Sequence, residues 1–149
     1  MATICSIAVL NGPNLNMLGM REPHIYGHQT LSDIEAGCRK LAKEKQLEID
    51  WYQTNFEGDL ITKIQSLAES VDWIVINAAG LTHTSVALRD ALSLFPGGVI
   101  EVHLSNIYTR ETFRHTSLIS EIAKGVIAGF GTTSYYLAID AISHLHTET

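Results

Sequence analysis

The sequence predicts an α/β domain built around a parallel sheet. Short apolar runs alternate with longer segments of helical period along its 149 residues, and this alternation is typical of βαβ units. Most of the short runs are rich in Val and Ile, as strands buried on both faces require. No repeat, linker or low-complexity tract breaks the alternation, so residues 1–149 are expected to form a single domain.

The elements can be placed in order along the chain. Strands are predicted for the short apolar runs, which are residues 4–10, 47–53, 72–77, 99–104 and 125–130. Helices are predicted where apolar residues recur every three or four positions, which are residues 31–42, 60–68, 82–94 and 132–146. Thr30 and Asp33 resemble a capping box before the first helix, and the third helix is expected to run from Thr82 to Leu94 behind an N-cap. Right-handed crossovers through these helices give a flavodoxin-like three-layer α/β/α domain with a five-stranded parallel sheet.

Composition and charge argue against several classes of protein. The formal net charge of −6 argues against nucleic-acid binding, and no window is long and apolar enough for a membrane span or a signal peptide. Cys5 and Cys38 are the only cysteines. Their places in a core strand and on the apolar face of a helix suggest buried, reduced thiols, and no metal-ligand pattern uses them. We expect a soluble cytoplasmic protein.

Unusual polar residues follow the ends of the predicted strands. Residues 10–27 follow the first strand, residues 77–83 follow the third, and the fourth continues into residues 104–106 with Arg110 and Arg114 beyond. Ligands bind outside the carboxyl ends of the strands in open parallel sheets. The sequence therefore predicts a binding site at this edge of the sheet.

The loop of residues 10–27 has neither helical nor strand periodicity. Gly and Pro residues turn its backbone at several places, and polar side chains stand between the turns. The phenol of Tyr26 comes five residues after the guanidinium of Arg21, so it can fold back beside that cation and have its anion stabilised. A solvated surface loop is the alternative interpretation.

Glu101 and His103 are two residues apart in a predicted strand, so their side chains point to the same face. A carboxylate there can orient the imidazole and hold it protonated, as a general acid requires. A buried Glu-His pair kept for structure is the alternative.

Nearby, residues 80–83 place hydroxyls and small residues at an expected helix N-terminus, which attracts anions, and Arg114 could bind a carboxylate in bidentate fashion.

These residue types predict proton abstraction and dehydration. A tyrosinate at position 26 could take a weakly acidic proton next to a carbonyl, while a protonated His103 donates to a departing hydroxyl. Neutral donors such as Asn14 would stabilise the enolate, directly or through water. The lysines fall on predicted helix surfaces or at an element end, so no desolvated Schiff-base lysine is evident.

Three stretches of the sequence resemble signature stretches of the type II 3-dehydroquinate dehydratases. They are LNGPNLNMLGMREPHIYG, INAAGLTHTSVALRDAL and IEVHLSNIYTRETFRHTS, and the similar segments EGDLITKIQ and GVIAGFGTTSYYLAI extend the match over nearly the whole chain. The resemblance implies Tyr26 as the proton acceptor, Arg21 as the residue that stabilises its anion, and His103 as the proton donor. It also implies that Asn14 holds the water that meets the enolate, and that Glu101 is the partner of the acid.

The resemblance further implies the substrate contacts and the assembly. The residues that match substrate-binding positions are Asn77, His83, Leu104, Ser105 and Arg114. Leu104 and Ser105 would bind the substrate carboxylate through backbone N–H groups. Asp90 matches a residue that a neighbouring subunit supplies, since family members form dodecamers built from trimers. Residues 20–27 are expected to close over the substrate as a lid.

The implied reaction is the anti elimination of water from 3-dehydroquinate to 3-dehydroshikimate through an enolate, without cofactor or metal. This step serves the shikimate pathway and aromatic amino acid biosynthesis, or the breakdown of quinate. Two rival functions stay open on physical grounds. A flavodoxin-like module that binds FMN or a nucleotide phosphate would use the same edge, although no Gly-rich phosphate loop is present. A non-catalytic homologue that only assembles or senses a metabolite would keep the core but could lose Tyr26 or His103. Both residues are present in this sequence.

Overall fold

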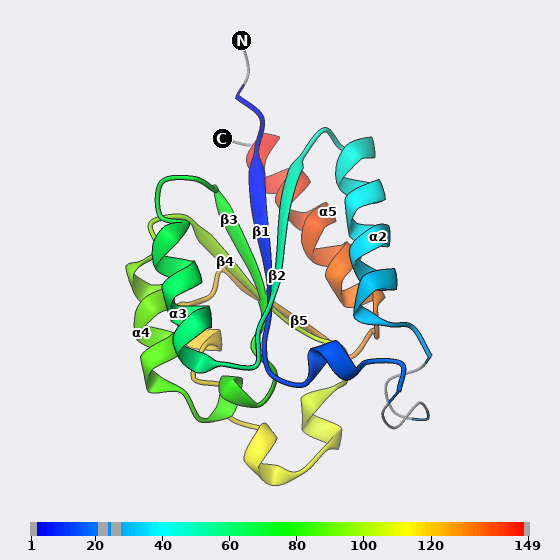
Figure 1. Cartoon of the computed structure of the whole chain (residues 1–149), viewed down its shortest axis with the longest axis vertical. Helices are drawn as coiled ribbons and strands as arrows, with labels where there is room; N and C mark the ends of the chain where they lie inside the picture. The colour runs from blue at the N-terminus through cyan, green and yellow to red at the C-terminus, as the bar shows by residue number, and fades with distance from the viewer. Residues whose placement is uncertain (1–2, 21–23, 25–27, 148–149) are drawn as a thin grey trace.

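Five parallel strands form one sheet in the computed structural model, which describes residues 3–20, 24 and 28–147 (Figure 1). The strands are β1 (Ser6–Asn11), β2 (Glu48–Gln53), β3 (Trp73–Asn77), β4 (Gly98–His103) and β5 (Gly125–Ala128). Their order across the sheet is β2-β1-β3-β4-β5, and every neighbouring pair is parallel. This confirms the predicted five-stranded parallel sheet.

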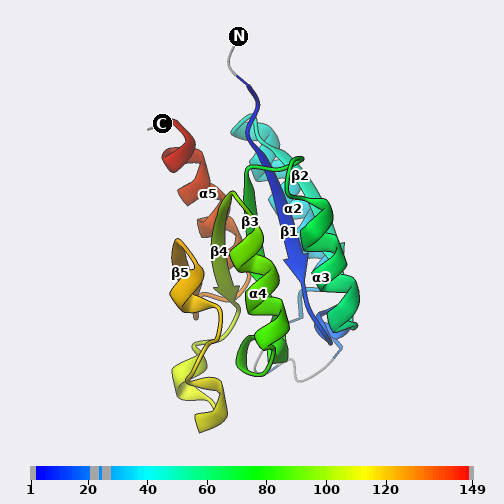
Figure 2. The ribbon, with the colours of Figure 1, turned by 90° about the vertical axis from the view of Figure 1, so that its left-hand side faces the viewer.

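Helices cover both faces of the sheet, which confirms the three-layer architecture (Figures 1 and 2). The helices are α2 (Leu31–Glu44), α3 (Glu57–Ser66), α4 (Val86–Leu94) and α5 (Thr133–Thr147). α2 and α5 lie on one face, and α3 and α4 lie on the other. Side chains alternate along β1 accordingly. Ile7 and Val9 pack towards α2 and α5, whereas Ala8 and Leu10 pack towards α3 and α4, and all four are fully buried.

The first helix starts as the sequence predicts. The Thr30 hydroxyl accepts a hydrogen bond from the Asp33 backbone N–H (3.1 Å), and the Asp33 carboxylate accepts one from the Thr30 backbone N–H (3.0 Å). This reciprocal pair is a capping box, and it satisfies two backbone donors that the helix itself cannot.

The third helix does not start where the sequence predicts. Residues Ala79–His83 form a 3-10 helix, and α4 begins only at Val86. The reason is the cap, because the Ser85 hydroxyl accepts from the Leu88 backbone N–H (2.9 Å). The prediction of a continuous helix from Thr82 was therefore wrong, and the hydroxyl of Thr82 lies before the N-terminus of the α-helix.

Several element boundaries also differ from the prediction. β1 begins at Ser6 rather than residue 4 and includes Asn11, and the loop after it contains a 3-10 turn at Leu15–Met17. β5 ends at Ala128 instead of residue 130. It ends there because Gly129 has φ 99°, a left-handed conformation that turns the chain away from the sheet.

Cys5 and Cys38 are buried free thiols, as the sequence suggests, although Cys5 lies just before β1 and not within it. Burial raises the pKa of Cys5 to about 11 and that of Cys38 to about 12. Both groups therefore stay protonated and unreactive at neutral pH.

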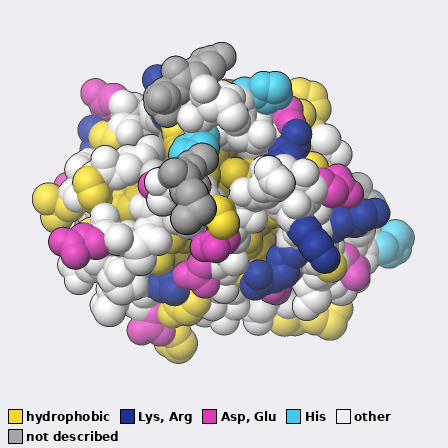
Figure 3. Space-filling view, turned by 90° about the horizontal axis from the view of Figure 1, so that it is seen from above, with side chains coloured by type: hydrophobic (Ala, Val, Ile, Leu, Met, Phe, Trp, Pro, Cys, Tyr) yellow, Lys and Arg dark blue, Asp and Glu magenta, His cyan; other side chains and the backbone are white. Residues whose placement is uncertain are grey.

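Figure 3 shows the end of the molecule where the two chain termini lie (compare Figure 1). Acidic and basic side chains lie near one another around this face, although Lys and Arg gather mainly on its right-hand side. Among the described residues, no helix has both the length and the apolar character that crossing a membrane requires.

Candidate active site

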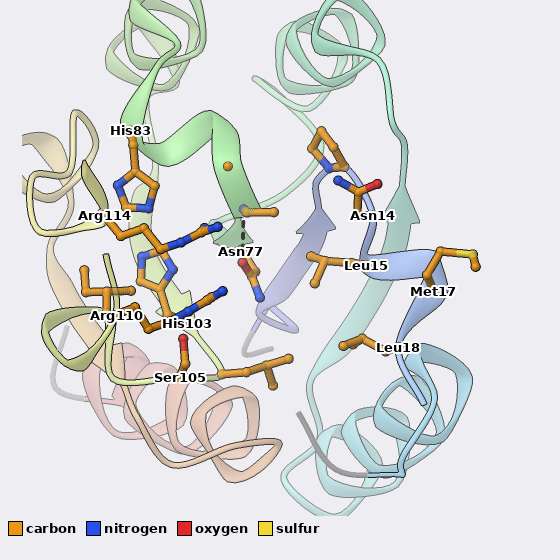
Figure 4. Close-up of a pocket in the computed structure, with 15 residues that line it drawn as sticks. Asn14, Leu15, Met17, Leu18, Asn77, His83, His103, Ser105, Arg110 and Arg114 are labelled. Atoms are coloured by element: carbon orange, nitrogen blue, oxygen red, sulfur yellow. Dashed lines mark hydrogen bonds between the residues drawn. The ribbon is translucent and has the colours of Figure 1, made fainter. Parts of the chain in front are cut away.

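A cavity of about 190 Å³ opens at the carboxyl ends of β1, β3 and β4 (Figure 4). This is the edge where the sequence predicts a binding site. It lies between two sets of residues (Figure 4). The apolar wall follows β1 and consists of Pro13, Leu15, Met17 and Leu18. The polar wall lies across the cavity and consists of His83, His103, Ser105, Arg110 and Arg114.

Most of the predicted site residues line this cavity. They are Asn14, Asn77, His83, His103, Leu104, Ser105 and Arg114. Glu101 is fully buried behind His103. Residues as distant in sequence as Asn14 and Arg114 thus share one cavity.

Three predicted residues are not seen at the cavity. Tyr26 and Arg21 lie outside the described residues. Asp90 lies on α4, is exposed to solvent and does not line the cavity. Within a single chain, Asp90 therefore has no part in the site.

The apolar wall was missed in the sequence, and so was Ile107, which also lines the cavity. The spacing of Leu15 and Leu18 could have indicated this wall, because two leucines three residues apart in a polar loop are typical of a short helical turn. In the structure both leucines are buried against the core. The sequence places Arg110 beyond the fourth strand without indicating a role for it, and its side chain lies in the polar wall (Figure 4).

Glu101 and His103 form the buried pair that the strand period predicts. His103 Nε2 lies 2.5 Å from Glu101 Oε2, and the two residues are only 5% and 0% exposed. Burial raises the pKa of the Glu101 carboxyl, but hydrogen bonds from His103, Ser120 and Ser117 and the charge on His103 outweigh burial and hold the pKa below its ordinary value. Glu101 is therefore a carboxylate to which Nε2–H donates, and Nδ1 of His103 is left for a group in the cavity.

His83 is oriented in a similar way. Its Nδ1 lies 2.9 Å from the Thr116 carbonyl oxygen, which can only accept a hydrogen bond, so Nδ1 carries the proton. In the neutral ring Nε2 is then an acceptor. The rings of His83 and His103 lie nearly parallel, with centroids 6.3 Å apart and planes 20° apart. The cavity thus has two oriented imidazoles on one wall.

Asn77 is held by a chain of buried hydrogen bonds at the end of β3. Its Nδ2 donates to the Tyr135 hydroxyl (3.0 Å), and its Oδ1 accepts from the Ala79 backbone N–H (3.1 Å; dashed in Figure 4). The Tyr135 hydroxyl in turn donates to Asn11 Oδ1 (2.7 Å). Burial raises the pKa of the Tyr135 phenol, so the phenol is a neutral donor. These contacts fix which way the Asn77 amide points and leave its second N–H for a ligand.

The loop after β1 is pinned close to the end of β3. The Gly12 backbone N–H donates to the Asn77 carbonyl oxygen (2.8 Å), and a Cβ at Gly12 would lie only 2.5 Å from the Ala78 oxygen. Asn14 has φ 72°, and its backbone N–H donates to Asn55 Oδ1 (2.9 Å). Gln53 adds an amide hydrogen bond to the Gly12 carbonyl oxygen (3.2 Å). The loop is therefore held by neutral amide groups.

Two guanidinium groups give the polar wall its positive charge. Arg110 and Arg114 both line the cavity (Figure 4) and both interact with Glu111, through Nε contacts of 3.7 Å and 3.2 Å. Arg114 also lies over the Phe113 ring, 5.3 Å from its centroid. An anionic ligand, such as a carboxylate, would be favoured on this wall.

No lysine is found among the described residues that line the cavity. Lys45 and Lys63 pair instead with Asp140 and Asp50, at 2.8 Å each. The described part of the chain also has no group of three or more His, Cys, Asp or Glu side chains placed to hold a metal ion. What the cavity does offer is an acid-base pair, a second imidazole, amide donors and cations.

Comparison with known proteins gives a consistent result. The sequence model of the family described as Dehydroquinase class II matches residues 5–143. The chain is 50% identical over 137 residues to the 3-dehydroquinate dehydratase of Prochlorococcus marinus, covering 92% of this chain and 94% of that protein. It is 51% identical over 143 residues to the 3-dehydroquinate dehydratase of Brucella canis, covering 96% and 91%.

The fold gives the same answer. The crystal structure of the type II dehydroquinase from Butyrivibrio crossotus superposes with a TM-score of 0.92 at 42% identity, covering 95% of this chain and 99% of that one. The chain therefore belongs to the class II dehydroquinase family of enzymes.

Proposed function

We propose that the chain is a 3-dehydroquinate dehydratase that eliminates water anti through an enolate, with Tyr26 as the base and His103 as the acid. The observation that carries the proposal is the buried Glu101–His103 pair at the rim of a cationic cavity. Relatives at about 50% identity bear the name 3-dehydroquinate dehydratase, which supports the substrate and the product, 3-dehydroshikimate.

The acid step is supported by the geometry of His103. Glu101 holds Nε2 and stabilises the imidazolium, so the proton for the departing hydroxyl comes from Nδ1. The desolvated carboxylate stabilises the imidazolium more strongly here than it would at the surface, because the low dielectric strengthens the attraction between the two charges. A leaving hydroxyl placed against the polar wall would thus depart as water.

The base step rests on the loop that continues from the apolar wall. Leu18 lines the cavity, and eight residues further along the chain comes Tyr26. An ionised phenol needs its pKa lowered from about 10, and one pKa unit corresponds to about 1.4 kcal/mol of differential stabilisation. Arg21 supplies that stabilisation in this proposal. Residues 20–27 act as the lid that brings the base to the substrate.

The substrate carboxylate is assigned to the backbone N–H groups of Leu104 and Ser105, with Arg114 nearby. Asn77 and His83 bind hydroxyl groups of the substrate. Asn77 uses its second amide N–H, and His83 uses Nε2, because their protein partners leave these groups unused. Asn14 holds the water that meets the enolate oxygen. Glu101 orients the acid. No cofactor or metal takes part in this proposal.

Asp90 is assigned to the site of a neighbouring subunit. It is exposed on α4, away from the cavity of its own chain, so it is available for contact with a second copy. A trimer, and a dodecamer of trimers, would use it in this way. We further propose a cytoplasmic role in the shikimate pathway, towards the aromatic amino acids.

The test is a direct assay on the purified protein. We expect an enone absorbance to rise when the protein meets 3-dehydroquinate. It should rise equally with fresh substrate after the protein has been treated with borohydride in the presence of 3-dehydroquinate and the reagent has been removed, because no lysine imine forms that borohydride could reduce. The matched variant Tyr26→Phe should lose turnover and keep ligand binding. Loss of activity on borohydride treatment would contradict the proposed mechanism, and a folded protein without any turnover would contradict the proposed activity.

A further inference from the structure

Residues 116–120 lie directly behind both imidazoles of the polar wall. The Thr116 carbonyl oxygen accepts from His83 Nδ1 (2.9 Å). The Ser117 and Ser120 hydroxyls both donate to Glu101 Oε1, at 3.0 and 2.7 Å. We propose that segment 116–120 is a positioning element that fixes His83 through its backbone and keeps Glu101 the charged partner of His103 through two serine hydroxyls on Glu101.

The hydroxyl of Ser117 is oriented by the segment itself. Its oxygen accepts from the backbone N–H groups of Ile119 (3.0 Å) and Ser120 (3.1 Å). Because the hydroxyl oxygen already accepts two hydrogen bonds, its proton is directed away from these two N–H groups and is donated to Glu101. Ile119 is fully buried and anchors the segment in the core. The donor is therefore held in place before any ligand binds.

The two oxygens of Glu101 have separate partners. Oε2 accepts from His103, and Oε1 accepts from Ser117 and Ser120. Without these hydroxyls, Oε1 would be an unsatisfied atom of a fully buried carboxylate, and such an ion is costly. Protonation of Glu101 would then be favoured, and His103 would lose its charged partner. This step rests on the proposed role of His103.

The segment is also tied to the element that carries His83. The Leu118 backbone N–H donates to the Thr82 carbonyl oxygen (2.9 Å), and Arg89 Nη1 donates to the Leu118 carbonyl oxygen (2.9 Å). Thr82 and His83 belong to the same 3-10 helix, and Arg89 lies on α4. One short segment thus joins β4, the 3-10 helix and α4 behind the two rings.

Other charged groups face the same cavity as His103. Among the described residues that line it with His103, the titratable or cationic side chains are His83, Arg110 and Arg114. None of them belongs to segment 116–120, so substitutions of the serines leave all three in place. A change in the Glu101–His103 pair after such substitutions can therefore be assigned to the lost hydroxyls.

The experiment compares Ser117→Ala, Ser120→Ala and the double variant with Ser66→Ala. Ser66 is exposed on α3, and its hydroxyl donates to the nearby Lys63 carbonyl oxygen, so it is a matched control. We expect kcat to fall about 10-fold for each single variant and about 100-fold for the double, with KM changed by less than about 3-fold. Ser120→Thr keeps the hydroxyl and should restore most of the rate.

A second measurement does not depend on activity. The Glu101 carboxyl, labelled with 13C and identified by its absence in Glu101→Gln, should titrate at a higher pH in the double variant than in the wild type, by about one unit or more. A folded double variant with wild-type kcat, or with an unmoved Glu101 titration, would overturn the inference. If His103→Ala itself keeps full activity, the proposed mechanism fails instead, whatever the serine variants show.

Discussion

The two walls of the cavity are built by different means. The polar wall carries buried charge, and each imidazole on it has a fixed partner, Glu101 for His103 and the Thr116 carbonyl for His83. The apolar wall is part of a loop held by neutral amides, and its residue Met17 is 43% exposed. The proposed acid therefore stands on a strand of the sheet, whereas the proposed base, Tyr26, belongs to the chain that follows the apolar wall.

This division has a physical reason. Stabilising a charged imidazole needs a desolvated carboxylate whose own bonds are satisfied, and such a group can be built only where several elements meet. The buried charge therefore lies at the polar wall, where β4 and residues 116–120 meet. In our proposal, the lid movement is assigned to residues 20–27 and not to the pinned residues of the apolar wall.

The largest effect is expected from removing the proposed acid of the polar wall, His103. His103→Ala should lower kcat about 1,000-fold while KM changes little, because general acid catalysis acts in the transition state. His144→Ala is the control, since His144 is exposed at the end of α5 and pairs only weakly with Asp140, at 3.7 Å. Steady-state kinetics checks both variants. A similar rate for His103→Ala and wild type would remove the polar wall from the chemistry.

The next largest effect concerns Glu101. Glu101→Gln should lower kcat about 100-fold, because the imidazolium loses its counter-charge. It should also cost about 3 kcal/mol of unfolding free energy at pH 7.

The cost of Glu101→Gln should depend on pH. The folded-state pKa of Glu101 lies below its unfolded value of about 4.3. Its contribution is therefore complete above that value and is lost as the pH falls through the folded pKa. Urea unfolding of both proteins between pH 7 and pH 3 tests this. A stability gap that does not narrow in acid would contradict the assignment.

The loop of the apolar wall should respond to crowding at Gly12. Gly12→Ala puts a Cβ 2.5 Å from the Ala78 oxygen, so the loop must shift, at a cost of about 1 to 3 kcal/mol. We expect kcat/KM to fall about 10-fold. Gly58→Ala has open space around its Cβ in α3 and should leave the rate unchanged. Equal kinetics of the two variants would mean that loop position does not matter.

The smallest effect is expected from removing the buried Tyr135 hydroxyl, which accepts a hydrogen bond from Asn77. Tyr135→Phe keeps the packing but leaves Asn77 and Asn11 each one hydrogen bond short, which should cost about 1 to 3 kcal/mol of stability. Because the Asn77 amide loses its orientation, KM should rise a few-fold with kcat nearly constant. The control is Tyr108→Phe, at a residue 67% exposed. Thermal unfolding and kinetics measured together distinguish the two effects.

Much of the fold followed from local patterns. The period of two in a strand placed Glu101 and His103 on one face, and the Thr30–Asp33 spacing gave the first helix start. These features depend on neighbours in sequence, so they can be read directly. The start of α4 could not be read in this way, because both Thr82 and Ser85 are acceptable caps. Only the hydrogen bond that the Ser85 hydroxyl accepts from the Leu88 backbone N–H decides between them.

The residues that hold the site residues in place by hydrogen bonds were harder to predict. Ser117 and Ser120 lie 16 and 19 residues from Glu101, and Tyr135 lies 58 residues from Asn77. Nothing in a local pattern marks a serine that donates to a buried carboxylate, because such contacts depend on how whole elements pack. Pattern reading finds the groups that do chemistry more readily than the groups that hold them.

The most direct test is a crystal structure of the protein with a carboxylate-bearing analogue of 3-dehydroquinate. We predict that the ligand lies between the two walls, with His103 Nδ1 in hydrogen-bond contact with the position of the leaving hydroxyl and the Tyr26 hydroxyl on the opposite face of the ring. A ligand bound elsewhere, or a Tyr26 side chain turned away from the occupied cavity, would contradict the account.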